Sequence, residues 1–123
     1  MKKVLLVDDN QLVGKLASAY LCKHGFDVEV CQGPFGVLNR VRAFGPEVIL
    51  LDINMPGLSG VKLAELLKDA RAIHGFKVIL FSSEDENMQA GLVKDGLAQN
   101  YFIKGGSLEG LCEVINETAC ASA

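Results

Sequence analysis

The chain has 123 residues, of which 50% are hydrophobic and 22% are charged. This length and composition predict one packed domain over residues 1–123 and exclude global disorder. A net charge of −3 argues against direct nucleic-acid binding through a broad basic surface. The first apolar run ends at Asp8, and no run approaches the ~18 residues of a membrane span, so we expect a cytoplasmic protein without membrane contact.

The first half of the chain predicts two strands, each followed by a helix. Val4–Val7 is a continuous apolar run, typical of a strand covered on both faces of a parallel sheet. Helical spacing of apolar residues follows and stops at Gly25. Phe26–Val30 alternates apolar with charged residues, which favours an edge strand, and Pro34 suits the first turn of the next helix. The apolar residues before Gly25 are Leu12, Val13, Leu16, Ala17, Tyr20 and Leu21.

The second half predicts three more strands, each followed by a helix. Two of the strands are continuous apolar runs, and the third is only partly apolar, which favours the opposite edge of the sheet. Ser59 and Ser107 are suited to cap the helices that follow them. The strands are Val48–Leu51, Val78–Phe81 and Asn100–Ile103, with a weaker helix over Glu86–Lys94 between the last two.

This alternation predicts an α/β fold of the flavodoxin-like, doubly wound (βα)5 type. Right-handed crossovers, three buried strands and two edge strands fit a parallel five-stranded sheet of order 2-1-3-4-5. In such a sheet the ligand site lies at the carboxyl ends of the strands, near the switch point between the first and third strands. The four cysteines are scattered without metal-ligand spacing, and we expect free thiols in or near the core.

Polar residues directly follow four of the predicted strands. Because the carboxyl ends of parallel strands share one edge of the sheet, we expect these side chains to meet there. Singly, each is more typical of a turn or a helix cap, and only their joint placement indicates a site. They are Asp8 and Asp9 after the first strand, Asp52 after the third, Ser82 and Ser83 after the fourth, and Lys104 after the fifth.

Three neighbouring carboxylates predict a magnesium-assisted phosphoryl site. They repel one another unless a cation lies between them, and an open, all-oxygen ligand set suits Mg²⁺. A lysine and a serine hydroxyl can hold phosphoryl oxygens. Asp52 is the only carboxylate at its strand end, so it is the best nucleophile, which leaves Asp8 and Asp9 for the metal.

Four motifs make the chain resemble the receiver domains of two-component response regulators, and its size is close to that of the stand-alone chemotaxis-type regulators. The motifs are Val4–Asn10, Leu51–Gly60, Ile79–Ser83 and Tyr101–Lys104. The second reads Asp-x-x-Met-Pro-Gly-x-x-Gly from Asp52 and is the most specific. The resemblance covers essentially the whole chain and implies one receiver domain, a signalling switch rather than an enzyme.

The resemblance also implies roles for individual residues. Asp52 would accept a phosphoryl group from a sensor histidine kinase or a histidine phosphotransfer protein. Asp9, Asp52 and the main-chain carbonyl of Asn54 would hold Mg²⁺ directly, and Asp8 would act through water. By this resemblance the protein would be a phosphoacceptor with Mg²⁺ as its cofactor.

A second set of implied roles concerns switching. Lys104 would contact the phosphoryl group, and Ser82, rather than Ser83, would move toward it. Tyr101 falls at the position of the switch aromatic, although an ordinary edge-strand tyrosine explains it equally well. The switch would change a face formed by the last two helices and the last strand, where a downstream target protein docks. We expect the chain either to signal by docking or to be a domain of a larger protein.

One departure from the family pattern keeps other functions open. Lys104 is followed by Gly105 and Gly106 instead of the usual proline, which predicts a trans peptide bond, a freer loop and a less firmly aimed lysine. The departure is the one feature that favours a phosphorylation-independent protein-binding module.

Two enzyme classes lack the residues they need. A phosphatase of the haloacid-dehalogenase type would need a second aspartate where Asn54 stands, and a dinucleotide-binding enzyme would need a glycine-rich turn after the first strand.

Overall fold

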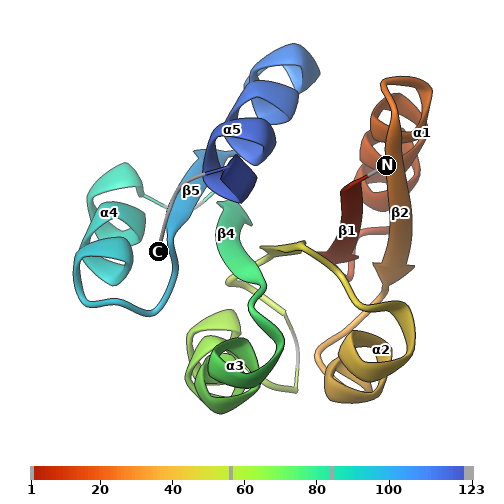
Figure 1. Cartoon of the computed structure of the whole chain (residues 1–123). Coiled ribbons are helices and arrows are strands. Elements are labelled where there is room, and N and C mark those ends of the chain that lie inside the picture. Colours follow the sequence, from red (N-terminus) through yellow and green to blue (C-terminus); the bar gives the residue numbers. More distant parts are fainter. Residues whose placement is uncertain (1, 56, 84, 121–123) are drawn as a thin grey trace.

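The computed structural model describes residues 2–55, 57–83 and 85–120, so Pro56 of the most specific motif lies outside the described residues. Strands and helices alternate along the chain as predicted (Figure 1). The elements are β1 (Lys2–Val7), α1 (Gln11–Lys23), β2 (Phe26–Cys31), α2 (Val37–Phe44), β3 (Val48–Leu51), α3 (Gly60–His74), β4 (Lys77–Ser82), α4 (Glu86–Lys94), β5 (Asn100–Ile103) and α5 (Leu108–Cys120).

The five strands form one parallel sheet in the order β2-β1-β3-β4-β5, which confirms the predicted topology. The two less apolar strands are at the edges, because an edge strand tolerates a wetter face. The chain reverses its direction of winding between β1 and β3, and in sheets of this kind ligands bind at the carboxyl ends of the strands on either side of that point. Within the described ranges no helix is long and apolar enough to span a membrane.

Helices cover both faces of the sheet, and alternate residues of each strand supply the two cores. Val4 and Leu6 of β1 face the layer of α1 and α5, whereas Leu5 and Val7 face the layer that contains α2 and α3. Val48 and Leu50 of β3 likewise face α1 and α5. Each central strand is therefore buried on both sides, as its continuous apolar sequence predicted.

Helix starts largely follow the predicted capping residues. The Ser59 hydroxyl accepts the N–H of Lys62 at 3.2 Å, and the Ser107 hydroxyl accepts the N–H of Gly110 at 3.0 Å. These bonds satisfy N–H groups that the first turn of a helix leaves unpaired. The bounds of α4 are those predicted.

The prediction of a helix from Pro34 is wrong, because α2 begins three residues later at Val37. Gly36 has a φ of 83°, a left-handed conformation that interrupts the helix. Phe35 therefore lies outside α2, and 74% of its surface is exposed. Leu12 and Leu16 of α1 are exposed as well, at 65% and 58%, although their spacing resembles that of core positions.

The prediction that the thiols lie in or near the core holds for two of the four cysteines. Cys31 is buried and Cys112 half-buried, whereas Cys22 and Cys120 are exposed at the last turns of α1 and α5. Composition alone does not show which way a residue in the last turn of a helix faces.

Gly60 allows α3 to begin directly against the end of β3. A Cβ at this position would lie 2.2 Å from the carbonyl oxygen of Asp52 and 2.5 Å from the Cα of Ile53. The Gly60 N–H donates to the carbonyl of Ile53 at 2.7 Å, which holds the loop after Asp52 against the helix. This close backbone approach requires glycine and fixes the main chain around Asp52.

We expect Gly60→Ala to lower the free energy of unfolding by about 1–3 kcal/mol or more, because the added methyl group would collide with backbone. Gly91→Ala is the matched control. A Cβ at Gly91 would lie in open space on α4, so this change should raise stability by about 0.5–1 kcal/mol. Urea titration measures both, and equal stability of the two variants would contradict the packing argument.

Candidate functional site

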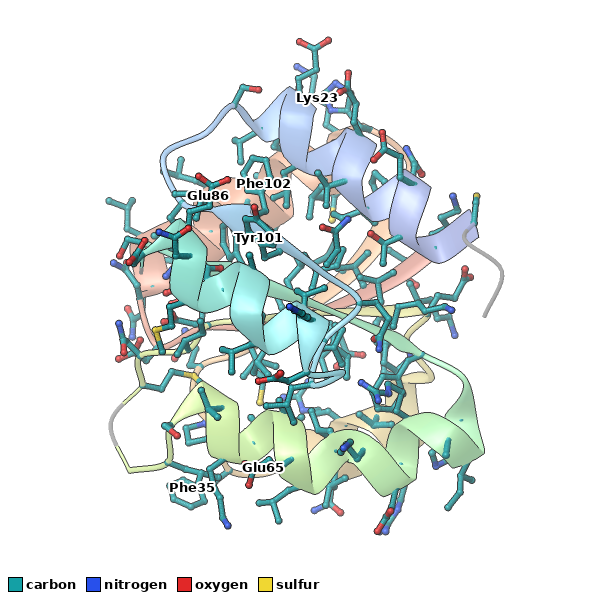
Figure 2. All side chains as sticks on the ribbon, turned by 90° about the vertical axis from the view of Figure 1, so that its left-hand side faces the viewer. Lys23, Phe35, Glu65, Glu86, Tyr101 and Phe102 are labelled. Carbon is teal, nitrogen blue, oxygen red and sulfur yellow. The ribbon has the colours of Figure 1, made fainter. Side chains whose placement is uncertain are left out.

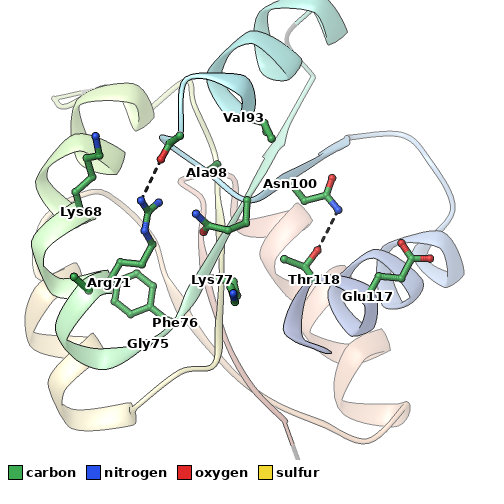
Figure 3. Close-up of a pocket in the computed structure, with 13 residues that line it drawn as sticks. Lys68, Arg71, Gly75, Phe76, Lys77, Val93, Ala98, Asn100, Glu117 and Thr118 are labelled. Carbon is green, nitrogen blue, oxygen red and sulfur yellow. Dashed lines mark hydrogen bonds between the residues drawn. The ribbon is translucent and has the colours of Figure 1, made fainter. Parts of the chain in front are cut away.

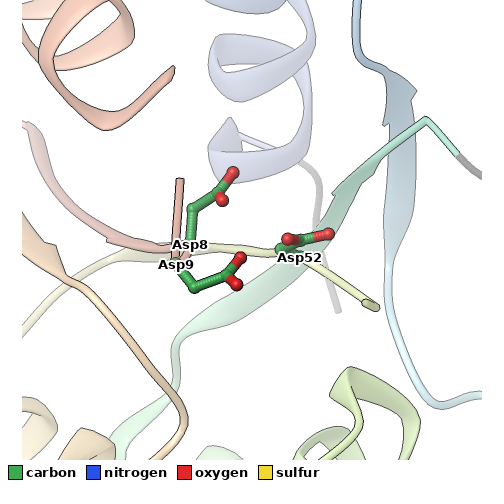
Figure 4. A group of neighbouring side chains, drawn as sticks. All are labelled: Asp8, Asp9 and Asp52. Atoms are coloured by element: carbon green, nitrogen blue, oxygen red, sulfur yellow. The ribbon is translucent and has the colours of Figure 1, made fainter. Parts of the chain in front are cut away.

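The three predicted aspartates lie together at the carboxyl ends of β1 and β3 (Figure 4). The hydrogen bonds between neighbouring strands continue one residue beyond the strand ends and fix the main chain of two of these aspartates. The N–H of Asp8 donates to the carbonyl of Cys31 at 3.0 Å, and the N–H of Asp52 donates to the carbonyl of Val7 at 2.9 Å. One carboxylate oxygen from each of Asp8, Asp9 and Asp52 lies within 4.8 Å of the others.

Two of these carboxylates are buried and held by backbone donors. Asp8 is fully buried, and only 4% of Asp52 is exposed. The N–H of Asn10 donates to Oδ1 of Asp8 at 2.9 Å, and the N–H of Asn54 donates to Oδ1 of Asp52 at 3.2 Å. Each carboxylate therefore keeps its second oxygen, Oδ2, for other partners.

Lys104 reaches both buried carboxylates from the end of β5. Its ammonium nitrogen lies 2.7 Å from Oδ2 of Asp8 and 3.4 Å from Oδ2 of Asp52. Burial raises the pKa of Asp52 above its ordinary value, while the Lys104 ammonium lowers it and the Asp8 carboxylate raises it further. The Lys104 ammonium therefore offsets only part of the free-energy cost of ionising Asp52 at this buried position.

The donor set suits a divalent cation. Three carboxylates and one ammonium give this rim a formal charge of −2. Within the described ranges, Oδ2 of Asp8 accepts no well-directed hydrogen bond, and its contact with Lys104 is one of charge. Three neighbouring carboxylates, two of them buried, with a single ammonium beside them fit a hard cation such as Mg²⁺.

The glycines after Lys104 do not misdirect this side chain. The Lys104 N–H donates to the carbonyl of Ser82 at 2.9 Å, and its ammonium lies 5.5 Å from the centre of the Phe81 ring. The predicted trans peptide bond is confirmed, since no described peptide bond is cis. Gly105 has a φ of 95°, which proline cannot adopt because its ring fixes φ near −65°.

The two predicted switch residues lie on neighbouring strands. Ser82 is buried at the end of β4, and Ser83 is exposed. Tyr101 is half-buried on β5, and its hydroxyl donates to Oε1 of Glu86 in α4 at 2.9 Å (Figure 2). The tyrosine is therefore tied to the helix that follows Ser82, although it lies on another strand.

One polar residue of this region was missed by the sequence analysis. Gln89 of α4 is fully buried, and its Nε2 donates to the carbonyl of Ser82 at 3.2 Å. The sequence feature that could have indicated its burial is the spacing of Gln89 and Leu92, which are three residues apart and so lie on one helix face. A buried amide needs partners, so such a position points to a specific contact.

Comparisons with known proteins all point to the receiver domains of response regulators. The family model of the response regulator receiver domain matches residues 4–116. The DNA-binding response regulator MtrA of Mycobacterium tuberculosis is 26% identical over 103 residues, which are 84% of this chain and 44% of that protein. The chain therefore spans less than half the length of this relative.

Solved structures share the fold over nearly the whole chain. Chemotaxis protein CheY4 of Vibrio cholerae has a TM-score of 0.87 at 22% identity, with 96% of this chain and 98% of that chain covered. Response regulator TrrA of Thermotoga maritima, solved in complex with Mg²⁺ and beryllofluoride, has a TM-score of 0.83 at 24% identity, with 96% and 99% covered. At these identities the likeness shows the fold alone.

The raised pKa of Asp52 predicts how stability depends on pH in metal-free buffer. The folded chain binds this proton more tightly than the unfolded chain, so stability falls as pH rises from the ordinary carboxyl range through the raised pKa. Asp52→Asn should be more stable than wild type at pH 7, and the difference should vanish as pH falls toward about 4. Urea titrations with a chelator measure this, and Asp69→Asn, at an exposed carboxylate, is the control.

A lower stability of Asp52→Asn than of wild type at pH 7 would contradict this account. It would mean that the contact with Lys104 outweighs the cost of burying the charged carboxylate.

We expect Gly105→Ala to lower the free energy of unfolding by about 1–2 kcal/mol, the cost of a left-handed backbone with a Cβ. A Cβ there would meet no neighbour, so the cost is one of backbone conformation alone. Gly33→Ala is the control, because its φ is not positive and its surroundings are open. It should change stability by less than about 0.5 kcal/mol in the same urea titration. Equal effects of the two changes would argue against the backbone explanation.

Proposed function

This chain belongs to the response regulator receiver domain family, whose members are signalling switches, and we propose that its phosphoacceptor is Asp52. The donor is a sensor histidine kinase or a histidine phosphotransfer protein. The observation that carries the proposal is the Lys104 ammonium placed between the carboxylates of Asp8 and Asp52 at the carboxyl edge of the sheet. An aspartate that serves only in a turn or a helix cap stays exposed, because burying its charge beside a second carboxylate costs free energy.

The proposed reaction is transfer of a phosphoryl group from a phosphohistidine. A carboxylate oxygen of Asp52 attacks phosphorus, the phosphorus–nitrogen bond of the donor breaks, and the imidazole nitrogen keeps the electron pair. Asp52 becomes an acyl phosphate. Lys104 favours the ionised carboxylate before transfer and is close enough to contact the phosphoryl oxygens afterwards.

We propose Mg²⁺ as the cofactor of this site. Asp8, Asp9, Asp52 and the main-chain carbonyl of Asn54 are the groups that would hold it, with Asp8 acting through water. When bound, Mg²⁺ supplies positive charge to the phosphoryl oxygens at a rim that is otherwise acidic. The formal charge of this rim and the Mg²⁺–beryllofluoride complex of TrrA support the assignment.

The switch is proposed to act through Ser82 and Tyr101. Movement of the Ser82 hydroxyl toward the phosphoryl group opens space, and Tyr101 turns inward and leaves Glu86. The face formed by α4, β5 and α5 then changes, and a downstream target protein docks on it. We propose that residues 1–123 act as one receiver domain and that these residues make no direct contact with nucleic acid. MtrA is described as DNA-binding, but this chain spans less than half of that protein.

We expect the wild-type protein to gain one phosphoryl group from phosphoramidate or acetyl phosphate in the presence of Mg²⁺, detected by mass spectrometry of the intact chain. Asp52→Ala should gain none, because it lacks the nucleophile. Asp69→Asn should react as the wild type does, because this carboxylate is exposed on α3. Absence of any mass increase in the wild type would sink the proposal.

The alternative, a protein-binding module that works without phosphate, predicts equal partner affinity for wild type and Asp52→Asn. The one feature that favoured this alternative was Gly105 in place of proline, which predicted a less firmly aimed Lys104. In the structure Lys104 contacts the carboxylates of both Asp8 and Asp52. A pull-down with and without beryllofluoride separates the two functions, since only a phosphoryl switch responds to this mimic.

A further inference from the structure

Helix α4 has few buried side chains. Of its nine residues, all described, only Gln89 is buried, and Met88 is 42% exposed. Leu92 and Val93 are only partly buried against the core. An element with so little buried apolar surface is at the low end of local stability, so the loss of a single hydrogen bond has a large relative effect on it.

Gln89 contacts the last residue of β4, Ser82. Its Nε2 donates to the main-chain carbonyl of Ser82 at 3.2 Å, and the same oxygen accepts the N–H of Lys104 at 2.9 Å. A carbonyl oxygen has two lone pairs, so both bonds can form at once. One atom therefore joins α4 to the residue that would move toward the phosphoryl group and to the lysine that would contact it.

A second contact holds the amino end of α4 at the protein surface. The Tyr101 hydroxyl donates to Glu86 at 2.9 Å, in the first turn of the helix and close to solvent. Water can replace this exposed bond when Tyr101 turns, so it costs little to break. The bond of Gln89 is buried, where an unpaired amide donor costs more free energy than at the surface.

The opposite end of α4 is held by another helix. The Arg71 guanidinium of α3 donates to the carbonyl of Gly96 at 3.1 Å, just after α4 ends (Figure 3). It also donates to the carbonyl of Leu97 at 3.4 Å. Arg71 and Gly96 line a hollow of about 840 Å³ at the amino ends of β4 and β5, away from the aspartates. The carboxyl end of α4 is thus fixed to a part of the fold that the switch does not touch.

We propose that Gln89 is a positioning residue that makes α4 follow the main chain at Ser82. Displacement of Ser82 toward a phosphoryl group moves the shared carbonyl, and Gln89 carries the first turns of α4 with it, while Arg71 holds the other end. This inference rests on the proposed function and adds to it the contact through which the site moves the docking face. Gln89 bonds to the main chain of Ser82, so the role proposed for it is transmission rather than chemistry.

The test compares Gln89→Met, which keeps the length of the side chain and loses the donor, with Asn87→Leu, the same change at an exposed amide of α4. Phosphoryl uptake from phosphoramidate should be unchanged in both. In amide NMR spectra, the shifts that beryllofluoride with Mg²⁺ causes at Gly91 and its α4 neighbours should shrink in Gln89→Met and stay at wild-type size in Asn87→Leu. Hydrogen exchange of the α4 amides should be about tenfold faster in Gln89→Met, the factor for one net hydrogen bond of roughly 1.4 kcal/mol.

The outcomes are separable. Normal phosphoryl uptake with undiminished α4 shifts in Gln89→Met and in a second variant, Gln89→Leu, overturns the transmission role and leaves the proposed function intact. A wild type that takes up no phosphoryl group overturns both. A third measurement needs no variant, because the side-chain NH2 signals of Gln89 in the wild type should shift on addition of beryllofluoride. Signals that stay fixed overturn the inference.

Discussion

The ammonium of Lys104 between the buried carboxylates of Asp8 and Asp52 is the interaction on which the site depends. A buried carboxylate is costly without a nearby positive charge, and two side by side are costlier still. The one lysine supplies less charge than the three carboxylates require. The site is therefore incomplete in its electrostatics, and a cation and a phosphoryl group are ligands of the kind that would complete it.

Sheet topology makes this interaction possible. The order β2-β1-β3-β4-β5 brings the ends of β1 and β3 side by side and places β4 between them and β5. Residues distant in sequence meet because parallel strands all end at one edge. Gly60 adds stiffness, since α3 begins in direct contact with the backbone of Asp52 and Ile53. The aspartate is thus placed by main chain and not by flexible side chains.

The other side of the site is built less firmly. Helix α4 buries one amide and no apolar side chain completely, and it is linked to the sheet through the main-chain carbonyl of Ser82 and the half-buried Tyr101. A rigid aspartate beside a weakly held helix is an arrangement in which a local change of charge can move a surface. The same sheet edge that fixes the acidic residues also carries the residues that connect to α4.

The sequence by itself determined the α/β class, the strand order, the helix caps at Ser59 and Ser107, and the gathering of carboxylates and lysine at one edge. Periodicity and capping are local properties, and topology follows from them by general rules. Only the tertiary structure decided that α2 begins after Phe35, that Leu12 and Leu16 face solvent, and that Gln89 is buried against Ser82. These features depend on which neighbouring elements cover a helix, and spacing along one segment carries no information about its neighbours.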